Sequence, residues 1–115
     1  MNVYDKAHEL ARGMKESTEY AEYRSAKELV FSDEKNKGML GDFKQRQHAL
    51  QTSILAGQKP DDKQLQELQN LYNIIAANTD LQRFLDAELT LDRLLADIYR
   101  IVGEAVEVDY SDLLK

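Results

Sequence analysis

The residues with the clearest chemical potential are a few acidic side chains and a histidine. Asp5 and His8 stand three residues apart, the spacing with which helical bundles offer carboxylate and imidazole ligands to a di-iron or di-manganese site. Glu88 lies within an apolar stripe, and Asp92 follows it one helical turn later. These residues make a carboxylate-bridged di-metal protein one alternative function.

The rest of such a metal site is hard to assemble from this sequence. The second histidine, His48, is preceded three residues earlier by Gln45, and an amide is a poor ligand for these metals. A dinuclear site needs about four carboxylates that converge in one core. The acidic residues here are scattered and are more simply explained as solvated helix charges. We therefore expect no metal and no other cofactor.

Other catalytic chemistry has little support in the sequence. The chain has no cysteine, which excludes a thiol nucleophile, thiolate zinc ligands and cysteine-bound iron–sulfur clusters. It contains no HExxH, no phosphate-binding glycine loop and no GxSxG. We do not expect an enzyme.

Positive charge gathers on the predicted third helix and on the end of the helix before it, at Arg24, Lys27, Lys35, Lys37, Lys44 and Arg46. On a helix, Lys37, Lys44 and Gln51 share one face. Direct RNA binding by this basic helix is a second alternative. Asp33, Glu34 and Asp42 accompany these cations, and the net charge of the chain is -6, which opposes nucleic-acid binding. We expect no direct contact with nucleic acid.

Composition indicates one helical domain. The chain of 115 residues is 43% hydrophobic and 31% charged, with one proline, and it has no long period-2 alternation. No apolar run approaches the roughly 20 residues that span a bilayer, and the first residues lack a signal-peptide pattern. We predict a cytoplasmic, all-α bundle with no membrane contact, formed as a single domain over residues 1–106. Residues 107–115 are predicted to be an acidic, frayed C-terminal tail.

Capping residues divide the chain into about five helices. Asn2 can cap the first helix, and Ser17 or Thr18 the second. The third is predicted to begin after Ser32 and to stop at Gly57. After the turn at 57–61 a fourth helix follows, with Asp61 and Gln64 as its capping box, and the fifth is predicted to run from a Thr79 cap to about Ala105. The two long helices, the third and the fifth, are expected to be antiparallel.

The fifth helix carries an apolar stripe with alternating spacings of 3 and 4, at Leu81, Phe84, Glu88, Leu91, Leu95, Ile98, Val102 and Ala105. Such a helix is roughly 40 Å long and needs matching helices, from its own chain or from another copy. We therefore predict an oligomer. If Leu91 and Leu95 are buried, their replacement by alanine should cost about 2–5 kcal/mol.

Two polar residues and two glycines interrupt the long stripes. Gln47 and Glu88 occupy seam positions, where a buried polar group can fix register or partner number. Alternatively, both residues lie at a partly exposed edge. Gly38 and Gly41 each cost about 1 kcal/mol in a helix interior. They predict either a loose start of the third helix or a neighbour that packs closely there.

The order of several short segments resembles the YlbF/YmcA family of small bacterial proteins, nearest to its YheA-like branch. The match rests on the opening run 3–11, Tyr20, Tyr23, Phe43, Gln47, the turn 57–60, the run 84–88 and the closing segment 97–105. This resemblance implies an all-helical, oligomer-forming cytosolic protein. Relatives act with the partner YaaT on competence, sporulation and biofilm formation, and they are linked to ribonuclease Y and messenger RNA maturation. Those regulatory relatives carry cysteines associated with iron–sulfur clusters, which this chain lacks.

Residues and resemblance together predict a non-catalytic adaptor or regulatory protein. Its partners would be further copies of itself, other regulatory proteins of the family or a ribonuclease complex. The candidate interface residues are aromatic or apolar residues, with two polar seam residues among them: Tyr20, Tyr23, Gln47, Glu88, Leu91, Leu95 and Ile98.

Overall fold

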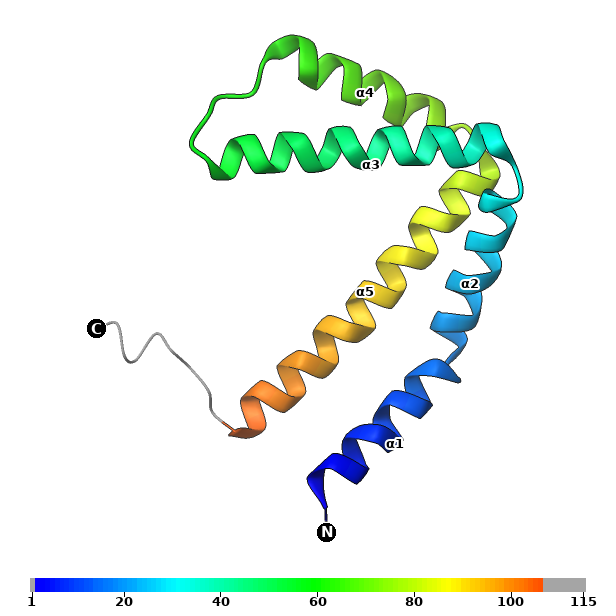
Figure 1. Ribbon diagram of the computed structural model, residues 1–115, viewed down its shortest axis with the longest axis vertical. Coiled ribbons are helices and arrows are strands. Elements are labelled where there is room, and N and C mark those ends of the chain that lie inside the picture. The colour runs from blue at the N-terminus through cyan, green and yellow to red at the C-terminus, as the bar shows by residue number, and fades with distance from the viewer. Residues whose placement is uncertain (1, 107–115) are drawn as a thin grey trace. The chain divides into compact units, whose positions relative to one another are not determined.

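The computed structural model describes residues 2–106 and contains five α-helices (Figure 1). They are α1 (Val3–Lys15), α2 (Thr18–Phe31), α3 (Glu34–Leu55), α4 (Asp62–Ala76) and α5 (Thr79–Val106). The described residues include no strand. The predicted all-α class is confirmed, and α3 and α5 are the two longest helices, as predicted. The tail predicted at 107–115 lies outside the described residues.

Short polar side chains cap the helices where the sequence indicates. The side chain of Asn2 accepts a hydrogen bond from the backbone N–H of Tyr4, at 2.8 Å. Ser17 Oγ accepts from the N–H of Tyr20 at the start of α2, at 3.1 Å. These bonds satisfy N–H groups that have no partner within the helix.

Two of the five helix starts differ from the prediction. The side chain of Asp33 caps α3 by accepting from the N–H groups of Lys35 and Asn36, so the cap lies one residue beyond Ser32. The predicted Thr79 cap of α5 is wrong. Asn78 Oδ1 accepts from Leu81 N–H at 3.1 Å, and Thr79 is the first helical residue. Asparagine competes well with threonine at this position because its amide oxygen also reaches free N–H groups.

The end of α3 is set by Gly57. Its backbone has φ of 82°, a left-handed conformation that glycine adopts without a Cβ clash. The N–H of Gln58 donates to the carbonyl of Ser53 at 3.0 Å, which closes the last turn. Asp61 then starts α4 by accepting from Lys63 N–H at 3.0 Å.

The chain divides into two compact units. Unit 1 is formed by Met1–Tyr23 and Asp86–Lys115, and unit 2 by Arg24–Leu85. The boundaries fall inside α2 and α5, so each of these helices contributes to both units. The single domain over 1–106 and the antiparallel course of α3 and α5 stay predictions.

Unit 2 contains most of the buried apolar residues: Ala26, Val30, Leu40, Phe43, Ile75, Leu81 and Phe84. Within it α3 and α4 form an antiparallel pair. Phe43 meets Tyr72 with ring centroids 6.1 Å apart, whereas Arg46, further along α3, reaches back to Glu67 on α4. The opposite order of these partners along the two helices fixes their direction.

A hydrogen-bonded pair of asparagines, one buried and one half-buried, ties the start of α3 to the start of α5. Asn36 is 7% exposed, and its Oδ1 accepts a hydrogen bond from Asn78 Nδ2 at 2.9 Å. Asn78 thus donates to Asn36 and accepts from Leu81. The bond gives the buried side-chain oxygen of Asn36 a donor, which avoids the cost of an unsatisfied polar group.

The two glycines of α3 have no close neighbour. A Cβ at Gly38 or Gly41 would meet nothing within 4 Å, and the helix is regular from Glu34 onwards. Neither predicted explanation, a loose start or a closely packed neighbour, applies.

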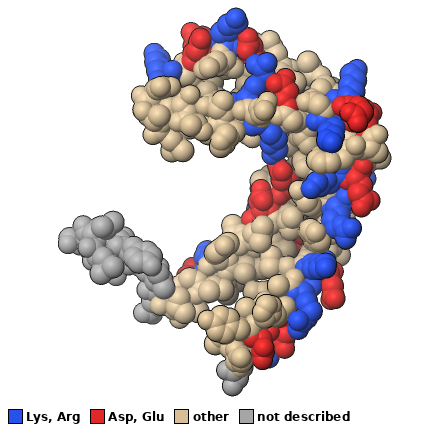
Figure 2. Space-filling view, in the orientation of Figure 1, with Lys and Arg blue, Asp and Glu red and all other residues tan. Residues whose placement is uncertain are grey.

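Unit 1 has little core. Ala87 is the one buried apolar side chain among its described residues, and α1 buries none of its residues. In the view of Figure 2, the face of the second half of α5 that is turned toward the viewer carries few charged side chains. Two helices cannot enclose a hydrophobic core between them as four can.

Candidate interaction surface

An apolar groove lies within unit 1, where α1 ends and α2 begins beside α5. Met14, Lys15, Tyr20, Leu91 and Leu95 line it, and its volume is about 290 Å³. Lysine supplies the one formal charge of this lining. The groove can accept an apolar side chain of a partner.

Local hydrogen bonds and ring stacking hold one wall of the groove. Ser17 Oγ donates to the carbonyl of Met14 at 2.6 Å and accepts from the N–H of Tyr20 at 3.1 Å. Tyr20 and Tyr23 stack with ring centroids 6.4 Å apart and 20° between the ring planes. These contacts fix where Met14 and Tyr20 stand.

An exposed apolar strip continues from the groove along α5. Leu95, Tyr99, Val102 and Val106 follow one another at spacings of 4, 3 and 4, which places them on one face of the helix. Their exposed fractions are 40%, 79%, 52% and 63%. Leu95 belongs to both features, so groove and strip form one surface.

The charged residues of this part of α5 lie on the other side of the helix. Arg100 pairs with Asp97 and with Glu104, each at 3.7 Å, along the face opposite the strip. This segregation leaves the strip without a charge between Leu95 and Val106. An uncharged, exposed helix face of this kind is typical of helix-to-helix association.

The structure brings together some of the predicted interface residues and separates others. Tyr20, Leu91 and Leu95 line the groove, and Tyr23 stacks on Tyr20. Glu88 and Ile98 are half-buried on α5. Gln47 is half-buried on α3 in unit 2, so it is not part of this surface.

Sequence reasoning missed Met14 and Lys15 in the groove and Tyr99 in the strip. Met14 lies one helical turn after Leu10, another apolar residue of α1, and this spacing was a signal in the sequence. Tyr99 lies off the 3–4 stripe that singles out Leu95 and Ile98, because a broad apolar face has two edges. Periodicity does not indicate which edge is exposed.

The residues of the apolar stripe of α5 become more exposed toward the C-terminal part of the helix. Leu81 and Phe84 are 0% and 4% exposed, whereas Leu91 is half-buried and Leu95 is 40% exposed. Full burial of Leu91 and Leu95 was the condition for a large stability loss on mutation, and that condition is not met.

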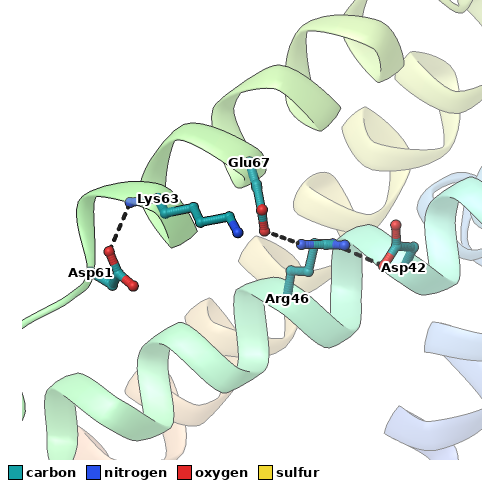
Figure 3. A network of polar contacts seen from close by, with 5 residues as sticks. All are labelled: Asp42, Arg46, Asp61, Lys63 and Glu67. Atoms are coloured by element: carbon teal, nitrogen blue, oxygen red, sulfur yellow. Dashed lines mark hydrogen bonds and ion pairs between the residues drawn. The ribbon is translucent and has the colours of Figure 1, made fainter.

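The basic residues that the sequence places on one helix take part in separate sets of contacts. Arg46 Nε donates to Asp42 at 3.0 Å and Arg46 Nη1 to Glu67 at 2.8 Å (Figure 3). The hydrogen bond with Asp42, and then that with Glu67, raise the pKa of Arg46. Lys37 instead lies over the ring of Phe31 together with Lys27.

The described part of the chain does not bring together the ligands of the alternative di-metal site. Within residues 2–106 no group of three or more His, Asp and Glu side chains could hold a metal ion. Asp5 and His8 are exposed on α1.

Comparison with known sequences identifies the family. The profile of the family described as "Control of competence regulator ComK, YlbF/YmcA" matches residues 3–107. The chain belongs to this family. The YlbF/YmcA resemblance predicted from the sequence is confirmed.

Individual relatives agree over nearly the whole chain. A UPF0342 protein of Caldicellulosiruptor saccharolyticus is 44% identical over 93% of this chain and 89% of its own. Another, of Symbiobacterium thermophilum, is 41% identical over 93% and 96%. The solved structure of a DUF964 protein from Bacillus stearothermophilus has the same fold, with a TM-score of 0.81 at 19% identity over 91% of this chain and 92% of that one.

No helix within the described residues is both long enough and apolar enough to cross a membrane.

Proposed function

We propose that this YlbF/YmcA-family protein is a cytoplasmic, non-enzymatic helical adaptor that acts by binding other helices through unit 1. One observation carries the proposal: the groove and the uncharged strip of α5 form a continuous apolar surface around Leu95. A family described by its control of a regulator is consistent with protein partners. Other regulatory proteins of the family, or a ribonuclease complex, are the partners that the family resemblance suggests.

The first partner of this surface is a second copy of the chain. Unit 1 supplies α1 and most of α5, and both helices present apolar residues that no described part of the chain buries. Four helices around one core are a stable arrangement, and two copies of unit 1 supply four. A two-fold interface uses the same patch on both copies.

Several contacts must combine for such an interface to be stable. A standard interface buries about 800 Å² on each partner, which is more than one pocket contributes. The groove would hold anchor side chains, while the strip and the apolar face of α1 would supply the rest of the area. Apolar and aromatic anchors at the centre of an interface carry most of its binding energy.

Val102→Glu tests this proposal, because it places a charge in the strip at a position that is already half exposed. Leu89→Glu is the matched control, since Leu89 is also exposed on α5, at 52%, but lies off the strip. Light scattering after size exclusion should show a dimer or larger oligomer for the wild type and for Leu89→Glu. Val102→Glu should be monomeric, with unchanged helicity by circular dichroism.

The same three proteins serve as tagged baits in cell lysate. A partner that the wild type and Leu89→Glu capture, and Val102→Glu does not, supports adaptor binding through the strip. A wild type that is monomeric at high micromolar concentration and captures nothing in a strip-dependent manner would contradict the proposal.

A further inference from the structure

Tyr99 is the most exposed side chain of the strip on α5, at 79%. It follows Leu95 by four residues and so lies one helical turn further along the same face. It does not line the groove of its own chain. Tyrosine combines a large apolar ring with a polar end, and such side chains often anchor protein interfaces.

The groove of unit 1 matches a tyrosine side chain in size and chemistry. Its volume is about 290 Å³, and an apolar cavity of about 150 Å³ already holds benzene. Met14, Tyr20, Leu91 and Leu95 provide walls that suit an aromatic ring. Lys15 is the charged residue of the lining, and its ammonium has no ion pair or hydrogen bond with a described residue. It can donate to a phenolic oxygen at the mouth of the groove.

We propose that Tyr99 of a second copy fills this groove, and that the two copies therefore pair with their α5 helices antiparallel. This pairing rests on the self-association through unit 1 proposed above, and it names the residue that anchors the contact. Under two-fold symmetry each copy gives one tyrosine and receives one. Neither groove is complete without the other copy.

Shape favours the antiparallel pair over a parallel one. In a parallel pair, residues of the same number face each other, so groove would lie opposite groove and exposed tyrosine opposite exposed tyrosine. In an antiparallel pair, Tyr99 of one copy reaches the level of Leu91 and Leu95 of the other. A protruding side chain then meets a groove at two places, which gives the close packing of stable interfaces.

The same register also gives the longest contact. With Tyr99 opposite the midpoint between Leu91 and Leu95, the two-fold axis passes at the level of Ala96. Ala96 is the centre of residues 86–106, the described part of α5 in unit 1. The two segments therefore overlap over their whole length. Filling the groove and covering the whole strip are separate requirements, and one register meets both.

Substitutions of Tyr99 test the anchor. Sedimentation equilibrium of the full chain measures the dissociation constant of the dimer. Tyr99→Ala should raise this constant by at least about thirtyfold, the loss expected of an interface hot spot. Tyr4→Ala is the matched control, because Tyr4 is 77% exposed in the same unit but lies on α1. It should raise the constant by less than about threefold, and circular dichroism should show wild-type helicity for both variants.

The hydroxyl of Tyr99 gives a second readout. Tyr99→Phe keeps the ring but loses the hydrogen bond from Lys15 of the other copy, so the dissociation constant should rise by about two- to tenfold. Lys15→Met removes the donor and keeps an apolar side chain in the groove wall. In the Lys15→Met background, Tyr99→Phe should change the constant by less than about twofold, because two partners of one bond do not contribute additively.

Engineered cysteines report the direction of the pair, because the chain has none of its own. In the antiparallel register Leu91 of one copy lies beside Val102 of the other, within reach of a disulfide. A mixture of Leu91→Cys and Val102→Cys chains should therefore form the mixed disulfide. Either variant alone should not cross-link, since its two cysteines would lie about 15 Å or more apart along the helices.

Three results would overturn the anchor. Equal losses for Tyr99→Ala and Tyr4→Ala, with a dimer that Val102→Glu still abolishes, would leave the function proposed for unit 1 standing without this anchor. Cross-linking of Val102→Cys chains with one another, without the mixed product, would show a parallel pair. A wild type that is monomeric at high micromolar concentration would remove the second copy that supplies the tyrosine, and strip-dependent capture from lysate would then decide the adaptor function by itself.

Discussion

The two units use the same kind of helix in different ways. In unit 2, α3 and α4 pack against each other, and the helices α2, α4 and α5 each contribute a fully buried side chain, Val30, Ile75 and Leu81, at 0% exposure. In unit 1, α1 and the longer part of α5 are also amphipathic, yet Ala87 is the one buried apolar residue among the described residues of this unit. Amphipathic periodicity is therefore no evidence of burial within the same chain.

The contrast assigns different roles to the two units. Burial of apolar area drives folding, so the core of unit 2 supplies most of the stability of the isolated chain. Unit 1 keeps its apolar area accessible, and that area is free to stabilise a complex. The following predictions test this division, and they are ordered by expected effect.

The largest loss of stability is expected in the core of unit 2. Leu81→Ala removes a fully buried side chain and should lower the free energy of unfolding by about 2–5 kcal/mol, measured by urea denaturation. Leu55→Ala, at a position that is 88% exposed, should change it by less than about 0.5 kcal/mol. Similar losses in the two variants would mean that the core is misplaced.

A smaller loss is expected for the polar pair of unit 2. Asn78→Ala removes the cap of α5 and leaves the buried side chain of Asn36 without its donor, which should cost about 1–3 kcal/mol. Asn70→Ala is the control, because Asn70 is exposed on α4 and accepts only from Gln66. Thermal unfolding of both variants at the same protein concentration gives the comparison.

In unit 1 a comparable leucine should contribute little to the fold. Leu95→Ala should cost no more than about 1 kcal/mol in dilute protein, because the side chain is 40% exposed. Its effect should grow with protein concentration, since the proposed dimerisation would couple the residue to stability by mass action. A loss above 2 kcal/mol that is independent of concentration would remove the distinction between the units.

The smallest effect is a gain. Gly41→Ala should stabilise the protein by about 0.4–1 kcal/mol, because α3 has open space at this position and alanine favours a helix. Gly57→Ala should destabilise it despite equally open space, because the φ of 82° strains a residue with a Cβ. Opposite signs in calorimetry would confirm that backbone conformation decides between the two sites.

Much of the fold could be predicted because it depends on local chemistry. Asn2, Ser17, Gly57 and Asp61 act on neighbours within a few residues, so their roles can be inferred without knowing the fold. The same reasoning assigned the cap of α5 to Thr79 because it considered one helix at a time. The side chain of Asn78, which caps α5, is also held by a hydrogen bond to Asn36, 42 residues away in the sequence.

The candidate site was less accessible to prediction. Tyr20, Leu91 and Leu95 could be proposed because their spacing shows a face, but Gln47 was grouped with them although it belongs to unit 2. The pairing of Lys27 and Lys37 on Phe31 joins the end of one helix to the start of the next. Periodicity describes one helix and is silent about contacts between two.

The hydrogen bond between Asn36 and Asn78 also bears on how this chain can vary. It joins Asn36, near the start of α3, to Asn78, which follows α4. The hairpin formed by α3 and α4 therefore begins and ends at the same place. The turn between α3 and α4 can therefore be lengthened, shortened or replaced without moving the residues where α2 ends and α5 begins. The loop at 57–61 is accordingly the natural place to insert a tag or a reporter domain, and the one where we expect relatives to differ most in length.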